Sequence, residues 1–378
     1  MEFKLILKKI YNTLTVEERQ IFDAWYNESN EHRIYFHRVK KNYLNGLKEV
    51  DLNKGWRGVT LKIGTRKKRQ TFFKYAAAIA MLFATGLLWL YNSKETLIPG
   101  PEQSVVTTKN TIEVGTDKAT LTLDDGSQIA LEKGGVYETE KASSNGERLV
   151  YKETAKTAEK TDAQNILTIP RGGQFFVILA DGTKIWVNSE TQLKYPVTFT
   201  KNKTREVELV YGEAYFEVSP SSEHNGSNFI VHTEGQEVEV LGTEFNIKAY
   251  KTEDQITTTL VEGKVLVENG RNAENLAPGQ QSQLNRSSQE LTTSSVDVFD
   301  EVSWKRGFFS FKKRSLEDIM KVLSRWYDVD VVFQNEEMKE LTFNGIFRRT
   351  QNIDEILNIM RNTNEVNYEI NKKTITMK

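Results

Sequence analysis

Apolar and polar positions follow four different patterns along this chain of 378 residues. Up to residue 62, apolar residues recur at helical spacing, and residues 75–91 then form one run without a charged residue. Between residues 103 and 300 apolar and polar residues alternate, and from Trp304 onward helical and strand patterns follow each other. The pattern predicts a multidomain protein with a small all-α domain, one transmembrane helix, a β-rich domain and a C-terminal α+β domain.

The N-terminal 70 residues are expected to form a small helical domain. Thr15 and Glu18 have the spacing of a capping box, in which a threonine hydroxyl and a glutamate satisfy the first amides of a helix. Phe22 and Trp25 follow at helical spacing, and Asn30 is a candidate cap for a third helix. A domain of this size is close to the lower limit for independent folding, so we expect it to need a partner.

The uncharged run predicts a membrane span over residues 72–92. The 17 residues from Tyr75 to Tyr91 reach about 25 Å as a helix, and three more residues reach the thickness of a bilayer core, about 30 Å. Residues 1–70 carry 16 Lys and Arg against 8 Asp and Glu, whereas the rest carries 35 against 44. By the positive-inside rule, the N-terminus is cytoplasmic and residues from about 93 onward lie outside.

An internal repeat marks the β-rich region. Residues 121–129 resemble residues 177–185, and each copy has an Asp-Gly pair between alternating apolar positions, which is a strong hairpin signal. We expect a linker and a first β repeat over residues 93–165 and the main β domain over residues 166–300. The hairpins are expected to stack into a twisted antiparallel or solenoid-like structure.

The C-terminal residues 304–378 predict a small α+β domain. Strand patterns alternate with two helical patterns that begin near Ser315 and Asn352, and a last hairpin surrounds residues 371–373. The predicted order is β-α-β followed by β-α-β-β, which corresponds to two βαβ-like halves.

The residue types argue against most kinds of catalysis. The absence of cysteine excludes thiol catalysis, disulfide scaffolds and cysteine-based metal sites. No phosphate-binding loop, dinucleotide fingerprint or Gly-x-Ser-x-Gly elbow occurs. His32 and His37 are five positions apart, which does not place them on one helix face as metal ligands would require. His224 lies in a polar loop and His232 in a β-type run, and neither has an obvious serine or aspartate partner in the sequence. We therefore predict no cofactor, no metal and no catalytic residue from motifs. The basic run before the span fits membrane topology better than direct contact with nucleic acid.

Several motifs in one order resemble FecR-type anti-sigma factors, the single-span regulators of bacterial cell-surface signalling, in the form found in Bacteroidetes-like bacteria. The resemblance covers essentially the whole chain and is densest in the β-rich region. The motifs are Leu179-Ala-Asp-Gly-Thr-Lys-Ile-Trp-Val-Asn188, Leu193-Lys-Tyr-Pro196, Gly212-Glu-Ala-Tyr-Phe-Glu-Val218, Val240-Leu-Gly-Thr-Glu-Phe-Asn-Ile247, Leu260-Val-Glu-Gly-Lys-Val265 and Leu276-Ala-Pro-Gly-Gln280, with Arg325-Trp-Tyr327 near the C-terminus.

The resemblance implies a function and a location. The cytoplasmic domain is expected to bind an extracytoplasmic-function sigma factor. The periplasmic part is expected to sense the signalling domain of a TonB-dependent outer-membrane receptor, and the C-terminal unit resembles the short secretin/TonB domain of such receptors. The protein is thereby placed in the inner membrane, where envelope proteases are expected to cut it in response to the signal.

The resemblance also implies candidate site residues. Trp25 and Tyr26 fall where the family's cytoplasmic domain carries tryptophan-centred positions; Phe36 replaces the commoner tryptophan, and Trp56 is a further aromatic match. Some members of the family are thought to cut themselves at a Gly-Thr pair such as Gly242-Thr243, where the threonine hydroxyl would attack the preceding carbonyl. The alternative is that this pair simply turns the chain into the next strand.

Two other classes of function stay open from the residues alone. A membrane-anchored β-rich enzyme, such as a glycan hydrolase, would need acid and base residues gathered in a deep pocket of the β domain. A scaffold protein of the envelope is the second alternative. A scaffold would not need the aromatic-rich helical domain on the inner side of the membrane.

Overall fold

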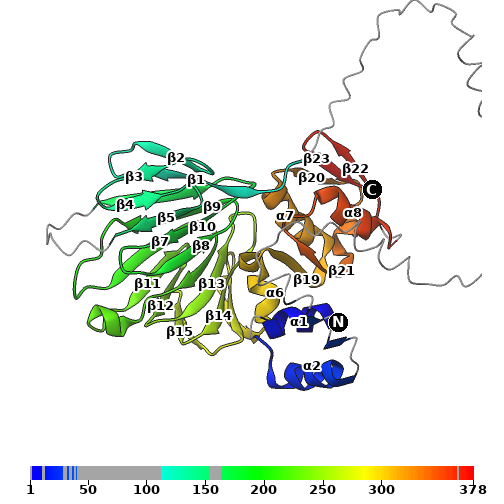
Figure 1. Cartoon of the computed structure of the whole chain (residues 1–378), viewed down its shortest axis with the longest axis horizontal. Helices are drawn as coiled ribbons and strands as arrows, with labels where there is room; N and C mark the ends of the chain where they lie inside the picture. The colour runs from blue at the N-terminus through cyan, green and yellow to red at the C-terminus, as the bar shows by residue number, and fades with distance from the viewer. Residues whose placement is uncertain are drawn as a thin grey trace, which may run out of the picture. The chain divides into compact units, whose positions relative to one another are not determined.

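The computed structural model describes residues 2–10, 13–28, 32–33, 36–37, 40, 112–152, 163–363 and 366–378. The chain forms two compact units, Met1–Lys109 and Asn110–Lys378, which are considered separately (Figure 1). The predicted span at residues 72–92 and the candidate residue Trp56 lie outside the described residues. Within the described part, none of the helices has the length and apolar character needed to cross a membrane.

The first unit begins with two helices, α1 (Glu2–Ile10) and α2 (Val16–Glu28). The predicted capping box is confirmed. The Glu18 amide donates to Thr15 Oγ1 at 3.2 Å, and the Thr15 amide donates to Glu18 Oε2 at 3.1 Å. A small apolar core of Ile6, Phe22 and Phe36 holds the helices together.

The described residues of the β domain form 18 strands. Their bounds are β1 (Thr116–Thr122), β2 (Gln128–Glu132), β3 (Tyr137–Glu138), β4 (Ala142–Ser144), β5 (Arg148–Tyr151), β6 (Gln164–Ile169), β7 (Gly173–Ile178), β8 (Lys184–Val187), β9 (Thr191–Pro196), β10 (Arg205–Glu217), β11 (Phe229–Thr233), β12 (Gln236–Val240), β13 (Glu244–Ala249), β14 (Gln255–Glu262), β15 (Val265–Glu268), β16 (Ala273–Leu276), β17 (Gln280–Asn285) and β18 (Leu291–Ser295). The β-rich prediction is thus confirmed, and the first repeat belongs to the same body as the later strands.

These strands form two layers that share β10. The first sheet has the order β2-β1-β6-β9-β10-β11-β12-β15-β16. The second sheet has the order β3-β4-β5-β7-β8-β10-β13-β14-β17-β18. Alternate side chains of both sheets enter one apolar core, as the burial patterns of β6 and β7 show. From β11 to β18, successive hairpins lie alternately in the two sheets: β11–β12 and β15–β16 in the first, β13–β14 and β17–β18 in the second. The predicted stacking of hairpins thus takes the form of two facing layers.

Most strand pairs are antiparallel, as expected, but three pairs in the β domain are parallel. They are β1–β7, β5–β7 and β10–β11. The repeated hairpins β1–β2 and β7–β8 have the same turn, because Gly126 and Gly182 both have φ +82° and both donate their amides to the residue three positions earlier. Three-residue loops with a left-handed glycine are a common hairpin connection, so the local signal predicted them correctly.

Strand β10 changes sheet at Gly212. Its first half pairs with β9 and β11 in the first sheet, and its second half pairs with β8 and β13 in the second. Gly212 has φ +101°, and a Cβ atom there would lie 2.2 Å from Thr191 Oγ1. A glycine at this position lets one long strand turn the corner between the two layers.

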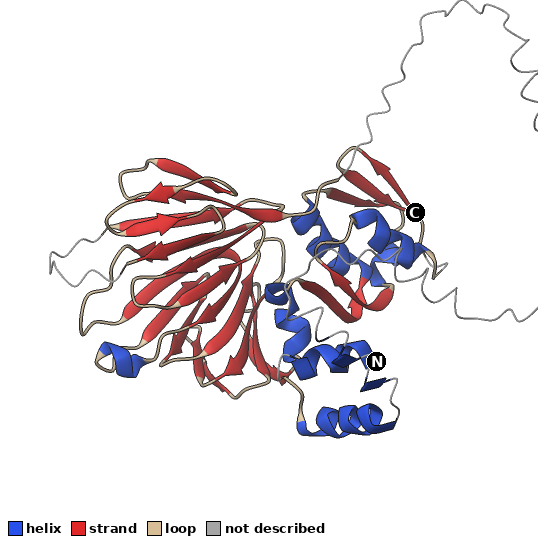
Figure 2. Ribbon diagram, in the orientation of Figure 1, coloured by secondary structure: helices blue, strands red, loops and turns tan. Residues whose placement is uncertain are grey.

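The C-terminal domain follows a connector made of α6 (Val298–Val302) and the short helix η3 (Ser303–Arg306). Its elements are β19 (Phe308–Ser315), α7 (Leu316–Tyr327), β20 (Asp330–Phe333), η4 (Glu336–Glu340), β21 (Thr342–Arg348), α8 (Ile353–Arg361), β22 (Tyr368–Asn371) and β23 (Thr374–Met377). Figure 2 shows that the α-helices of the second unit gather in the connector and this domain, whereas the β domain is built of strands and loops apart from the short η2 (Ser221–His224).

The predicted order of strands and helices in the C-terminal domain is confirmed. Ser315 caps α7 by accepting the Asp318 amide, whereas Asn352 begins α8 without a side-chain cap. The predicted last hairpin is confirmed, since β22 pairs with β23. The other strands do not pair within the two predicted halves. Instead β19 pairs with β21, and β20 pairs with β23, so each sheet combines both halves. The domain has its own apolar core.

Replacing Gly212 tests the corner of β10. Gly212→Ala should lower the free energy of unfolding by roughly 2–5 kcal/mol, because the new Cβ collides with Thr191 and the backbone is left-handed. Gly126→Ala is the matched control, since it has a similar φ but no atom within 4 Å of the new Cβ, and it should cost only about 1 kcal/mol. Chemical denaturation of both variants checks this, and equal costs would contradict the role of Gly212.

Candidate functional site

Three polar residues from separate motifs meet on the outer face of the second sheet. Asn188 follows β8, Glu213 lies on β10, and Asn246 lies on β13, which are adjacent strands. The buried carboxylate of Glu213 accepts hydrogen bonds from Asn188 Nδ2 at 2.7 Å and from Asn246 Nδ2 at 3.0 Å. The side chains before and after Glu213 point the other way or are absent, since Ala214 enters the apolar core and residue 212 is glycine. The alternation of β10 therefore forces Glu213 outward.

The connector covers this face. Trp304 donates its indole N–H to Asn246 Oδ1 at 3.2 Å. The ammonium of Lys305 lies 3.8 Å from the ring centre of Trp186 and 3.9 Å from that of Tyr215, and it pairs with Glu217 at 2.5 Å. A cation between two aromatic faces and a carboxylate is held by cation–π attraction as well as by its ion pair. The connector is therefore fixed to β8, β10 and β13.

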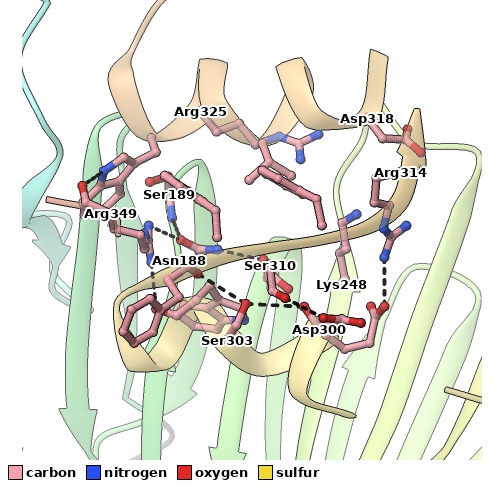
Figure 3. Close-up of a pocket in the computed structure, with 18 of the residues that line it drawn as sticks. Asn188, Ser189, Lys248, Asp300, Ser303, Ser310, Arg314, Asp318, Arg325 and Arg349 are labelled. Atoms are coloured by element: carbon pink, nitrogen blue, oxygen red, sulfur yellow. Dashed lines mark hydrogen bonds and ion pairs between the residues drawn. The ribbon is translucent and has the colours of Figure 1, made fainter. Parts of the chain in front are cut away.

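Arg349 completes the cluster from the C-terminal domain. It is 3% exposed, donates to Asn188 Oδ1 at 2.9 Å and to the Trp304 carbonyl at 3.2 Å, and stacks 3.6 Å above the Trp326 ring centre. Figure 3 shows Arg349 beside Asn188, below the helix that carries Arg325. Burial lowers the pKa of Arg349 to about 10, and burial raises the pKa of Glu213 above its ordinary value, against the attraction of Lys248.

A second charged cluster lies beside the first. Arg325 of α7 pairs with Glu253 at 2.8 Å and with Glu190 at 3.3 Å, and it stacks 3.6 Å from the ring centre of Tyr250. Glu253 also pairs with Lys248 at 2.7 Å. Burial by itself would raise the pKa of Glu253, but Lys248 and Arg325 together lower it below its ordinary value. The carboxylate is therefore held in its charged form between two cations.

The space between these clusters is small. A cavity of about 80 Å³ lies there, which has room for a few water molecules. The carboxylates of Glu213, Glu253 and Glu301 at its wall are all engaged by amides or cations. In the part of the chain that the structure describes, no group of three or more acidic or histidine side chains is arranged to hold a metal ion. The arrangement is suited to joining two domains, and it does not have the deep acid/base pocket expected of a glycan hydrolase.

The Gly242-Thr243 pair occupies the tight turn from β12 to β13. Gly242 has φ +144°, and a Cβ there would lie 2.9 Å from Pro220 Cα. Gly263 approaches the same peptide so closely that its own Cβ would lie 2.8 Å from Thr243 Oγ1. The Thr243 hydroxyl donates to the Lys264 carbonyl at 2.9 Å and accepts from the Lys264 amide at 3.4 Å, and neither partner can act as a general base.

The aromatic residues predicted in the first unit occupy different environments. Phe36 is 8% exposed and lies in the core against Phe22 and Tyr26, with ring centres 5.3 and 5.5 Å away. Trp25 and Tyr26 pack on the same core but stay partly exposed, and Trp25 stacks on His32 at 4.7 Å. Phe36 is thus placed as a core residue, whereas Trp25 and Tyr26 reach the surface.

Sequence reasoning missed the polar residues of the site. Asn188, Glu213 and Asn246 stand inside the motifs, beside glycine and aromatic residues that give stronger local signals. The sequence does carry one signal for these residues. A charged or amide residue within an otherwise apolar strand, as in Gly212-Glu-Ala-Tyr-Phe216, indicates a buried polar group with a specific partner. His224, for which the sequence shows no obvious serine partner, does have one in the structure, because Ser219 Oγ lies 2.8 Å from its Nε2.

Comparisons with known proteins place the site within two recognised regions. The family model described as FecR protein matches residues 165–266, and the model described as FecR, C-terminal, matches residues 308–377. Asn188, Glu213 and Asn246 lie in the first region, and Arg325 and Arg349 in the second. The two matches confirm the resemblance to FecR-type anti-sigma factors.

Two crystal structures of a candidate anti-sigma factor from Parabacteroides distasonis, at 1.65 and 2.50 Å resolution, resemble the chain with TM-scores of 0.51 and 26% identity. The similarity covers 56% and 57% of this chain and 98% of those chains. A search of curated proteins finds no match.

The charged pairs of Glu253 predict a dependence of stability on pH. Because its folded-state pKa lies below the ordinary value of 4.5, Glu253 stabilises the fold above pH 4.5 and loses this effect as the pH falls through the folded value. Glu253→Gln should lower the free energy of unfolding by about 2 kcal/mol at pH 7, and the difference from the wild type should shrink below pH 4.5. Thermal unfolding between pH 7 and pH 3 checks this, with exposed Glu262→Gln as the control. A difference that stays constant over this range would contradict it.

Proposed function

We propose that the protein holds an extracytoplasmic-function sigma factor at the inner membrane and changes this hold when a signal reaches its periplasmic part. Both matched regions belong to the FecR family, and the resembling structure is of a candidate anti-sigma factor, so a sigma-regulating role is the function best supported. FecR-type proteins are generally not enzymes, in agreement with the engaged carboxylates of the site. The observation that carries the proposal is that both FecR models match this chain, and that Arg349 joins the two matched regions within one structural unit.

On the inner side, α2 is the proposed contact with the sigma factor. Trp25 keeps an exposed edge, and Ile21, one turn before it on the same face, is 52% exposed. Val16 at the start of the helix is 77% exposed. An apolar helix face with a tryptophan is suited to a buried interface with another protein.

The location rests on the charge asymmetry around the predicted span at residues 72–92, which lies outside the described residues. The N-terminal unit is proposed to be cytoplasmic and residues from about 93 onward periplasmic. Reporter fusions at residues 60 and 110 test this orientation, and a periplasmic signal from the fusion at residue 60 would exclude the proposed sigma contact.

On the outer side, the C-terminal domain is the proposed contact with the signalling domain of a TonB-dependent receptor. Strands β20 and β22 are the edges of its three-stranded sheet, and Val332 on β20 is 50% exposed. An open sheet edge can accept a strand of a partner. Titration of the receptor domain into the purified protein tests this contact, and envelope proteases are the proposed executors of the response.

Co-purification with the sigma factor tests the function. The full chain and residues 1–62 should both retain an extracytoplasmic-function sigma factor, and Trp25→Ala should weaken binding by more than about 2 kcal/mol, or roughly 30-fold in Kd. Thr15→Ala is the control, because it removes the cap of α2 and no side chain of the exposed face. Normal binding by a folded Trp25→Ala variant would exclude Trp25 as the anchor, and no binding by any form would exclude the function.

Self-cleavage at Gly242-Thr243 is a second proposal, supported by the close packing of this peptide between Pro220 and Gly263. Attack of Thr243 Oγ1 on the Gly242 carbonyl carbon would convert the amide into an ester and free the Thr243 amine, and water would then hydrolyse the ester to leave a Gly242 carboxylate. Mass spectrometry of the purified protein should show two fragments whose masses sum to the chain plus one water. The fragments should disappear in Thr243→Ala and persist in Thr243→Ser, and a single intact mass would refute the proposal for this protein.

A further inference from the structure

The β domain and the C-terminal domain do not share an apolar core. The core of the β domain runs from Ala119 to Leu291, and the core of the C-terminal domain contains residues 309–377. Between them, the side-chain hydrogen bonds come mainly from three arginines. Arg349 binds Asn188, Arg325 binds Glu253 and Glu190, and Arg171 of the β6–β7 loop binds Asp330 at 3.2 Å and the Ser324 carbonyl at 3.1 Å. The junction is therefore charged and hydrogen-bonded.

One segment of the β domain does enter the C-terminal core. Ile112 and Val114 pack against that core, in a segment that precedes β1 and is the first described part of the second unit. Gly115 lies directly under Trp326, since a Cβ there would be 2.6 Å from the indole ring. We call residues 112–115 the stem, because along the chain they lead back toward the predicted span.

Trp326 connects the stem to Arg349. Its indole N–H donates to the Arg349 carbonyl at 2.8 Å, and the guanidinium of Arg349 stacks 3.6 Å from a Trp326 ring centre. The neighbouring backbone continues the contact, because the Gly172 amide donates to the Arg325 carbonyl at 2.7 Å and the Thr116 amide donates to Gly172 at 3.0 Å. The stem, Trp326 and Arg349 thus form one stack across the junction.

Arg349 holds this stack at a cost. None of the ion pairs found among the described residues includes Arg349, and its Nε has no partner there. The carboxylate of Glu213 is linked to it only through Asn188. Burying a guanidinium without a carboxylate contact is unfavourable, and separation of the domains would return Arg349, Arg325, Glu213 and Glu253 to water. Separation would leave most of each apolar core intact.

We propose that the C-terminal domain is a reversible clamp that grips the stem, residues 112–115, and that Arg349 stacked on Trp326 holds it closed. The domain opens about Gly307, which has φ +78° and open space around its Cα, and which joins the connector to β19. Opening frees the stem while the connector stays on the β domain through Trp304 and Lys305. Opening of the clamp would transmit a movement of the C-terminal domain to the stem and from there toward the predicted membrane span. This part of the proposal rests on the proposed function.

The cysteine-free chain allows a direct test. Glu113 on the stem and Lys372 on the C-terminal domain line one groove, so Glu113→Cys and Lys372→Cys, each carrying a pyrene, should give excimer fluorescence in the full-length protein when the clamp is closed. Arg349→Met should reduce the excimer signal at least about fivefold, because it removes the hydrogen bonds to Asn188 and to the Trp304 carbonyl. Gly115→Ala should do the same by forcing Trp326 off the stem. Arg361→Met, an exposed arginine of the same domain stacked on Tyr368, should leave the signal unchanged.

Undiminished excimer emission in both folded variants would overturn the proposal. If the variants fail to fold, hydrogen exchange of the wild-type protein tests whether the clamp opens. The amide of Gly172, which donates to the Arg325 carbonyl across the junction, should exchange at least about 100-fold faster than those of β10 and β13, because it opens with the clamp. Exchange of the Gly172 amide at the same rate as those of β10 and β13 would refute the clamp. Neither measurement uses a sigma factor or a receptor, so a failure of the proposed function would not affect them.

Discussion

The structure of the second unit depends on one buried carboxylate, that of Glu213. A charged group on the outer face of a sheet would ordinarily be hydrated, and burying it is unfavourable unless it is hydrogen-bonded. Here Asn188 and Asn246, on the strands at either side, each donate an amide hydrogen to it. Their carbonyl oxygens are then free to accept from Arg349 and Trp304. One carboxylate thereby orients two amides, and the amides in turn bind the C-terminal domain and the connector.

The two kinds of contact in this unit have different physical consequences. The sandwich of the β domain is held by a continuous apolar core, whose burial is favourable wherever apolar side chains meet. The junction is held by groups that must meet in fixed directions, such as the guanidinium of Arg325 between Glu253 and Glu190. Directional contacts specify one relative position of two domains while adding little net stability, because the cost of removing charges from water offsets most of their attraction.

Local signals in the sequence predicted the elements well. The capping box of Thr15 and Glu18, the two Asp-Gly hairpins and the cap at Ser315 each depend on residues within a few positions of one another, and all are present. The order of elements in the C-terminal domain followed from the same periodicities. By contrast, the pairing of β19 with β21 and of β20 with β23 depends on contacts between distant segments, for which periodicity has no signal.

The candidate site was the part least accessible to sequence reasoning. Asn188 and Arg349 are 161 positions apart, and nothing local to either residue indicates the other. In the first unit, apolar spacing placed Phe22, Trp25 and Phe36 on helices, but it could not separate the buried Phe36 from the half-exposed Trp25, because both are aromatic at helical intervals.

The arrangement of cores and charges also determines what a force on the C-terminal domain can do. A domain joined through a shared apolar core would resist separation until one core was exposed, at a free-energy cost that grows with the area uncovered. Here the cores are separate, and among the described residues those of the β domain that pack on the C-terminal core are Ile112 and Val114 of the short stem. A pull on the C-terminal domain therefore acts first on the arginine contacts and on the stem, before it acts on either core. The charged contacts between the two domains and the segment leading toward the predicted span thus lie at the same junction.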